Sequence, residues 1–237
     1  ESTIIGHVGI DGTNRRFFVS DHGKLKIFAY DLDSVLTTPE YQPSVKIDMK
    51  KKLFPDDYLY LNDTLCIAKI IEPIGNNDYK PSVARWNMAT EEINPMPYEY
   101  PDLKKVRFIY AASAEHQLYV QCYTQYDLMT ICDFNGNLKC NIYGPKWVNE
   151  KTQTQHYSLG VEFCGDKILA LYSGGDHRTD AYYPTKFLVF DLNGNYLKTL
   201  ETGYMITDFC YDKENNRLII NLNDEIQFAY LDLEGII

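Results

Sequence analysis

The chain has 237 residues, of which 45% are hydrophobic and 14% aromatic, and its formal net charge is −10 at pH 7. The length suits one large all-β domain covering 1–237, and the aromatic richness favours pleated, half-buried strands. The acidic balance argues against nucleic-acid binding, and no apolar run approaches the roughly 18 residues that a transmembrane helix needs.

An apolar strand recurs about every 50 residues, a period typical of repeat architectures. Its copies begin at residues 17, 65, 118, 168 and 218. A second strand follows each copy, and the pattern predicts these strands at 26–30, 82–86, 128–132, 187–190 and 226–230. A further strand precedes each pair, most clearly where 161–167 (VEFCGDK) matches 207–213 (TDFCYDK).

In two of these units a turn with the pattern Asp-x-Asn-Gly-Asn follows the third strand, at 133–137 and 191–195. Weaker copies lie at 31–34 and 232–235. Asn-Gly between apolar runs is a strong hairpin signal because the turn needs positive φ. The second unit departs from this pattern and has 89–92 (ATEE) in that place.

A fourth strand is expected after each turn, so each unit has four antiparallel strands. This pattern predicts an all-β protein of the β-propeller class, with five or six blades. No long segment shows helical periodicity. The last unit stops soon after its turn, so most of its fourth strand is missing. Propellers commonly complete such a blade with a strand from the other terminus of the chain, which removes the exposed edge. Residues 1–7 could supply it, or a further partial blade could precede residue 1.

The segment 17–31, with FFVSD followed by KIFAYD, resembles the NHL-type propeller repeat. Over nearly its whole length the chain is similar to the TolB-like six-bladed β-propeller proteins of Gram-negative bacteria, although five repeats are visible here. The resemblance implies export to the periplasm, or to the outer membrane and cell surface as a lipoprotein anchored upstream of residue 1. It implies no established activity, so no catalytic residue carries over, and we expect a monomer.

Loop lengths give the predicted propeller two unlike ends. The turns between first and second strands, and between third and fourth, are short. The other connections hold the long insertions, which are predicted at 37–57, 71–81, 89–105, 144–156 and 173–185. Because binding usually lies on loops positioned by a rigid scaffold, a ligand is expected at the long-loop end.

Aromatic side chains in these insertions are the first candidate ligand contacts, namely Tyr79, Trp147, Tyr182 and Tyr183. Exposed Tyr and Trp suit partner proteins or sugars. The alternative is that these rings only pack their own loops.

The polar insertion at 173–180 (SGGDHRTD) supplies the other candidates. Arg178 would bind an anionic group, and Asp176 with His177 would hold a metal or transfer a proton. Gly-Gly-Asp is equally turn chemistry, which leaves these residues without a ligand.

Two classes of function follow. The first is a non-catalytic binding or scaffold module of the cell envelope that binds a protein or a carbohydrate and needs no cofactor. The second is a metal-dependent hydrolase or lactonase-like enzyme with its site at the channel mouth, for which the candidate ligands are Asp78, Asp176, His177 and Asp180. Residues 76–78 are a further candidate site, for calcium. The absence of known catalytic motifs favours the first class.

The six cysteines form no CxxC pair, so a structural zinc site is not expected. In a domain of this size, buried free thiols are the expected state, because Cys packs as a small hydrophobe.

Overall fold

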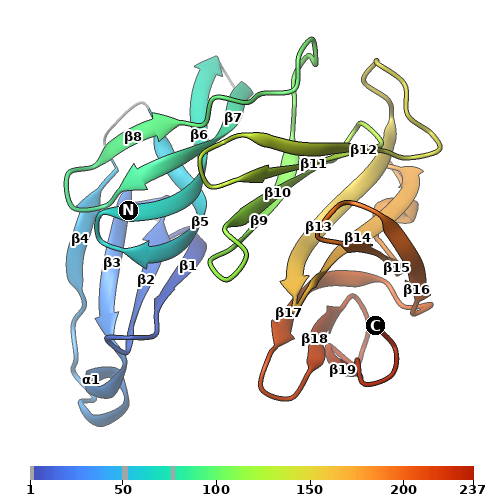
Figure 1. The fold of residues 1–237 in the computed structure, drawn as a ribbon. Coiled ribbons are helices and arrows are strands. Elements are labelled where there is room, and N and C mark those ends of the chain that lie inside the picture. The colour runs from blue at the N-terminus through green and yellow to red at the C-terminus, as the bar shows by residue number, and fades with distance from the viewer. Residues whose placement is uncertain (1–2, 50–52, 76–77) are drawn as a thin grey trace. The chain divides into compact units, whose positions relative to one another are not determined.

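A computed structural model of the chain describes residues 3–49, 53–75 and 78–237. The chain divides into two compact units, residues 1–99 and 100–237. Both consist of antiparallel sheets whose strands follow one another in chain order (Figure 1). These sheets are the blades of a β-propeller, which confirms the predicted fold class.

Unit 1 holds two four-stranded blades. Blade 1 consists of β1 (Ile5–Asp11), β2 (Arg16–Asp21), β3 (Lys26–Asp31) and β4 (Ser44–Asp48), with the short helix α1 (Leu32–Thr37) between β3 and β4. Blade 2 consists of β5 (Phe54–Asn62), β6 (Leu65–Gly75), β7 (Asp78–Asn87) and β8 (Glu92–Pro95).

Unit 2 holds three blades. Blade 3 consists of β9 (Phe108–Ser113), β10 (Leu118–Tyr123), β11 (Leu128–Asp133) and β12 (Leu138–Tyr143). Blade 4 consists of β13 (Thr154–Cys164), β14 (Lys167–Asp176), β15 (Lys186–Asp191) and β16 (Tyr196–Glu201), with the 3-10 turn η1 (Asp180–Tyr182) between β14 and β15. Blade 5 consists of β17 (Ile206–Asp212), β18 (Arg217–Leu222) and β19 (Phe228–Asp232), so it has three strands among the described residues.

A central strand carries apolar side chains on both of its faces, so it is buried from two sides. In β14, Ile168 and Ala170 pack into the core shared with blade 3. The alternate residues Leu169 and Leu171 pack into the core shared with blade 5. This two-sided burial explains why the strands appear in the sequence as short continuous apolar runs.

The two Asn-Gly turns have the same construction. Asp133 Oδ1 accepts the backbone N–H groups of Asn135 and Asn137 at 2.8 and 2.9 Å. Asp191 Oδ1 accepts the corresponding groups of Asn193 and Asn195 at 2.9 and 2.8 Å. The side-chain amide of Asn195, which donates to Asp191 Oδ2 at 2.8 Å, is the main reason why the pKa of Asp191 lies below its ordinary value, and the backbone bonds add to it. The predicted turns are confirmed.

The weak copy at 31–34 is a helix start, and its prediction as a hairpin turn is wrong. Asp31 Oδ1 caps α1 by accepting the N–H of Ser34 at 2.7 Å. In the true turns a glycine with φ of 80° or 85° stands at the position of Ser34. Without glycine there, the chain continues into a helical turn.

Three further expectations are corrected. The predicted loop 71–81 is mostly a long β6–β7 hairpin, in which Glu72 pairs with Lys80 and Pro73 with Tyr79. Of residues 1–7, one of the two predicted sources of a closing strand, Ile5–His7 belong to β1, which pairs with β2 inside blade 1. Residues 1–2 lie outside the described residues. The last predicted strand begins at Phe228 rather than at 226.

Candidate functional site

Hydrogen bonds gather the long connections of unit 2 at one end of its blades. The backbone N–H of Thr152 donates to the carbonyl of Gln125 at 3.2 Å, joining the β12–β13 loop to the β10–β11 turn. Thr202, after β16, donates to Thr185, before β15, at 2.9 Å. We call the connections 124–127, 144–153, 177–185 and 202–205 the loop end of unit 2.

Short turns lie at the opposite end of these blades. His116 Nε2 donates to the carbonyl of Gly165 at 2.8 Å, which joins the β9–β10 and β13–β14 turns. Cys140 Sγ lies 3.4 Å from the carbonyl oxygen of Asn193 in the β15–β16 turn. Within unit 2, the predicted separation of long and short connections is therefore present.

A cluster of four aromatic rings dominates the loop end. The ring of Trp147 lies 5.1 Å from Tyr143, 5.8 Å from Tyr100 and 6.3 Å from Tyr126, centroid to centroid. The angles between ring planes are 60°, 68° and 42°. Edge-to-face pairs of this kind are favourable beyond the area that they bury. Tyr143 remains 50% exposed, so the cluster offers an aromatic surface to solvent.

A buried carboxylate holds the loop that carries Trp147. Asp127, 1% exposed, accepts the backbone N–H of Lys146 through Oδ2 at 2.9 Å. Its backbone carbonyl accepts the N–H of Gly144 at 2.8 Å. A Cβ atom at Gly144 would lie 2.2 Å from the Asp127 carboxylate. Only glycine allows so close an approach, so the residue pair sets the path of the loop.

A histidine and a tyrosine complete this buried polar group. His156 Nδ1 lies 3.3 Å from the hydroxyl of Tyr172 and 3.7 Å from Asp127 Oδ1. Burial lowers the pKa of His156, and the neighbouring Asp127 opposes that shift. Burial also raises the pKa of Tyr172. His156 and Asp127 are each 1% exposed. The group therefore stabilises the loop from the protein interior and is not accessible to a ligand.

The polar insertion folds back on itself beside the aromatic loop. Asp176 Oδ1 accepts the backbone N–H of Arg178 at 2.9 Å and lies 3.4 Å from its Nε. The bond to the Arg178 backbone is the main reason why the pKa of Asp176 is lowered. The Ser173 hydroxyl donates to the carbonyl of Ala181 at 2.6 Å and closes the loop.

The two long loops of unit 2 are joined to each other. His177 donates to the carbonyl of Gln153 from its backbone N–H at 3.2 Å and from Nδ1 at 2.9 Å. Lys146 Nζ lies 3.5 Å from the carbonyl oxygen of Gly174. A carbonyl accepts only, so Nδ1 of His177 carries a hydrogen in its contact with Gln153.

The structure therefore brings some predicted site residues together. Trp147, Asp176, His177 and Arg178 lie on two joined loops. The rings of Tyr182 and Tyr183 lie 4.2 Å apart, centroid to centroid, on the second loop and are tilted by 33°. Tyr79 lies in β7 of unit 1 and pairs with Pro73, so it belongs to a hairpin rather than to this loop end.

Sequence reasoning missed Asp127, His156 and Tyr172. They lie on different strands or at strand ends, and no local motif links them. The nearest signal was Gly144, directly after β12, which marks a close approach of the backbone to another group.

Metal ligation was the second predicted chemistry. Over residues 3–49, 53–75 and 78–237, no group of three or more His, Cys, Asp and Glu side chains is placed to hold a metal ion. The side chain of Asp180 and residues 76–77, which carry part of the metal and calcium predictions, lie outside what the structure describes. Asp176 and His177 contact Arg178 and Gln153.

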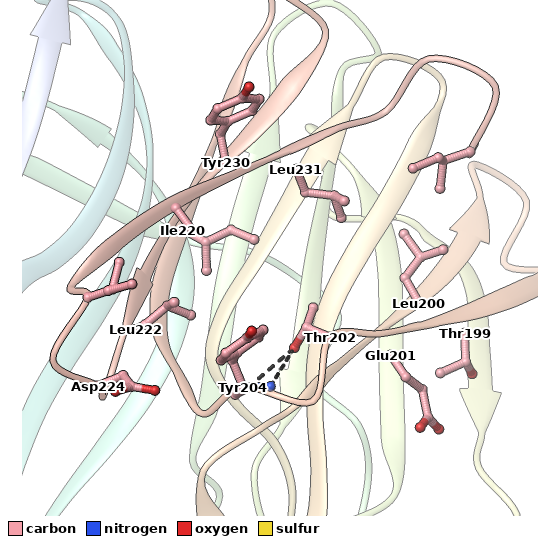
Figure 2. Close-up of a pocket in the computed structure, with 13 residues that line it drawn as sticks. Thr199, Leu200, Glu201, Thr202, Tyr204, Ile220, Leu222, Asp224, Tyr230 and Leu231 are labelled. Atoms are coloured by element: carbon pink, nitrogen blue, oxygen red, sulfur yellow. Dashed lines mark hydrogen bonds between the residues drawn. The ribbon is translucent and has the colours of Figure 1, made fainter.

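A separate groove of about 630 Å³ lies between β16 and the β18–β19 hairpin (Figure 2). Leu200, Ile220, Leu222 and Leu231 supply apolar lining. At one side Thr202 Oγ1 accepts the N–H of Tyr204 at 3.2 Å and fixes the connection to β17. No sequence pattern indicated this groove.

In the described part of the chain, no helix is long and apolar enough to cross a membrane.

No protein-family model matches the chain, and no curated protein sequence matches it. Among solved structures it is similar to the extracellular domain of a candidate one-component system from B. thetaiotaomicron, at 10% identity and a TM-score of 0.61, over 97% of this chain and 28% of that one. It is also similar to a chain of a nidogen/laminin complex, at 10% identity and a TM-score of 0.62, over 98% of this chain and 77% of that one. At such identities the likeness shows the fold alone.

Proposed function

We propose that this chain is a non-catalytic binding module that recognises a partner protein through the loop end of unit 2. One observation carries the proposal: the loop 144–153 is bonded to the end of β14 and to the connection 177–185 beside a partly exposed cluster of four aromatic rings. Aromatic residues on preorganised loops lose little entropy on binding and are the usual anchors of protein interfaces.

Ring geometry favours a protein over a carbohydrate. A sugar stacks flat on the open face of a ring, whereas Trp147 has three tyrosines around it at steep angles. Val148, next to it, is 48% exposed, and Lys146 is also exposed. A mixed patch of aromatic, aliphatic and basic groups is typical of protein interfaces.

The proposed setting is the cell envelope of a Gram-negative bacterium, outside the cytoplasm. Two observations support it: the resemblance to TolB-like exported lipoproteins, and the fold shared with a domain described as extracellular. The second structural neighbour comes from a nidogen/laminin complex, which supports a propeller that assembles with another protein.

Site-specific photo-crosslinking would test this proposal. A photoreactive phenylalanine at Tyr143, at the loop end, should crosslink to a partner protein in envelope extracts of the source organism. The matched control is Tyr196, 56% exposed at the start of β16 near the short turns, which should not give that product.

Affinity for the crosslinked partner then tests the role of the cluster. Trp147→Ala should weaken binding about tenfold or more, as expected for a hot-spot aromatic, while Trp147→Phe should retain most of it. Equal crosslinking from Tyr143 and Tyr196, or unchanged affinity in Trp147→Ala, would refute the loop end as the binding surface. Binding to a glycan array that Trp147→Ala abolishes would show a carbohydrate ligand instead.

A further inference from the structure

Two segments beside the aromatic cluster of unit 2 carry an excess of basic side chains. In residues 100–107 and 144–153 the exposed basic residues are Lys104, Lys105, Arg107, Lys146 and Lys151. The exposed acids of the same two segments are Asp102 and Glu150. The chain as a whole has a formal net charge of −10, so its local charge here is opposite in sign to its overall charge. We call the five basic residues the basic patch.

Ring contacts and a hydrogen bond join both segments to the aromatic cluster. The hydroxyl of Tyr126 donates to the carbonyl of Lys104 at 2.8 Å. The ring of Tyr126 also contacts Trp147, which directly follows Lys146 in the chain. Tyr100, at the start of the first segment, has its ring 5.8 Å from that of Trp147. The segments that supply rings to the cluster therefore also supply its neighbouring basic residues.

Lysines of the basic patch lack the acidic partners that many lysines of this chain have. Ion pairs with Asp or Glu are formed elsewhere by Lys24, Lys46, Lys69, Lys80, Lys167 and Lys213. Lys146 Nζ instead lies 3.5 Å from the carbonyl oxygen of Gly174. Among the residues that the structure describes, no carboxylate pairs with Lys104, Lys146 or Lys151. These ammonium groups stay available to a partner, although acidic residues outnumber basic ones by 33 to 23.

Charge decides which partner such a surface would select. The overall negative charge of the chain repels an acidic segment, whereas the basic patch attracts it, so association is directed to one place. Repulsion from the wrong surface is itself a source of specificity. A basic segment would gain no such selectivity, because an acidic protein attracts it in many places.

We propose that the aromatic cluster and the basic patch bind an acidic segment of the partner protein, a step that rests on the function proposed above. Carboxylates of the segment contact the basic patch, and an apolar side chain between them packs against the exposed part of the cluster. Exposed ion pairs are individually weak. The rings therefore supply most of the affinity, while the charges supply orientation and rate of association.

The product crosslinked through position 143 provides the first test. Peptide mapping by mass spectrometry of the product formed in envelope extracts should place the crosslink in a segment with more Asp and Glu than Lys and Arg. A neutral or basic segment would overturn the proposal. A product in which the crosslinked molecule is an anionic lipid or a polysaccharide would overturn it as well. Absence of any product from this position would refute the proposed function together with the acidic segment.

Charge reversal in the protein tests the basic patch, with a synthetic copy of the mapped segment as the probe. Lys104→Glu combined with Lys146→Glu should weaken binding about tenfold or more in low salt. The loss should be smaller at about 500 mM salt, where exposed charges are screened. Both lysines serve the fold through backbone groups, so these hydrogen bonds survive the change. The control combines Lys139→Glu with Lys198→Glu, an equal charge change at exposed positions of β12 and β16.

A neutral copy of the segment, with Asn for Asp and Gln for Glu, repeats the test on the unaltered protein. It should bind about tenfold more weakly than the acidic copy and lose most of the salt dependence. Equal binding of the two copies, or equal effects of the two double variants, would overturn the acidic segment. If Trp147→Ala still weakens binding in that case, the proposed function stands. Unchanged binding in Trp147→Ala would refute the proposed function itself.

Discussion

The carboxylate of Asp127 accepts the backbone N–H of Lys146 at 2.9 Å, although Asp127 precedes β11 and Lys146 lies in the loop after β12. Asp127 is 1% exposed, whereas Lys146 stands at the surface beside Trp147. A buried acid thus sets the conformation of the surface loop that carries the aromatic cluster. Changes beneath the loop should alter the proposed binding surface without removing any residue from it.

Gly144→Ala should destabilise unit 2. The added Cβ would lie 2.2 Å from the carboxylate of Asp127, which cannot move away freely because it is buried and bonded to Lys146. Overpacking of this kind costs about 1–3 kcal/mol. We expect a lower Tm and weaker near-UV circular dichroism from the Trp147 environment. Gly12→Ala is the control, because a Cβ there meets nothing within 4 Å. Equal effects of the two variants would contradict this role of Gly144.

His156 should make stability depend on pH in the acidic range. Burial holds its pKa below the ordinary value of 6.5 in the folded protein, so the unfolded chain takes up the proton first. Stability should therefore fall as the pH drops below about 6.5 and should stop falling, for this group, below the folded pKa. In His156→Gln the drop in Tm between pH 8 and pH 5 should be smaller than in the wild type. The difference in Tm between the variant and the wild type at pH 8 measures the effect of the substitution on packing alone. Equal drops in Tm between pH 8 and pH 5 in the two proteins would contradict the prediction.

Most of the strand framework could be predicted from the sequence because strands and turns are local features. Apolar runs such as 168–171 alternate between two cores, and Asp191 needs only its own next four residues to build its turn. The Asp127, His156 and Tyr172 group could not be predicted, because its contacts depend on how β10 to β14 are placed. The same limit applies to the groove beside β19.

The hairpin at 71–81 was missed for another reason. Pro73, Gly75 and Pro81 are ordinary loop signals, yet all three lie in strands. Met96 donates to the carbonyl of Val83, so by alternation Pro81 directs its missing N–H to the β8 side. The described pairing of β8 with β7 reaches only from Ala84 to Asn87, and proline is tolerated at such an edge.

Gly194→Ala should destabilise the protein more than Gly165→Ala. Both glycines have positive φ, at 85° and 59°, so each substitution costs about 1 kcal/mol of backbone strain. A Cβ at Gly165 meets nothing within 4 Å, whereas one at Gly194 would lie 2.7 Å from Cys140 Sγ in blade 3. The difference in unfolding free energy, measured in urea, reports the contact between the blades. The added Cβ would also lie 2.9 Å from Ile142 Cδ1 of blade 3, so the difference should shrink in a background that carries both Cys140→Ala and Ile142→Ala. A difference that persists in that background would assign it to the turn alone.

Thiol labelling should distinguish the six cysteines, none of which is in a disulfide. Cys210 is exposed and should react first, while Cys140, half-buried and with its pKa raised by burial, should follow more slowly. Cys122 and Cys164 should stay unmodified in the native protein, because burial excludes the reagent and raises both thiol pKa values. Burial also raises the pKa of Cys66 to about 12 and that of Cys132 to about 11, so they should resist as well. Mass spectrometry after brief alkylation measures this order, and Cys210→Ser should remove the fast phase. Rapid modification of Cys122 would show that the core between blades 3 and 4 opens in solution.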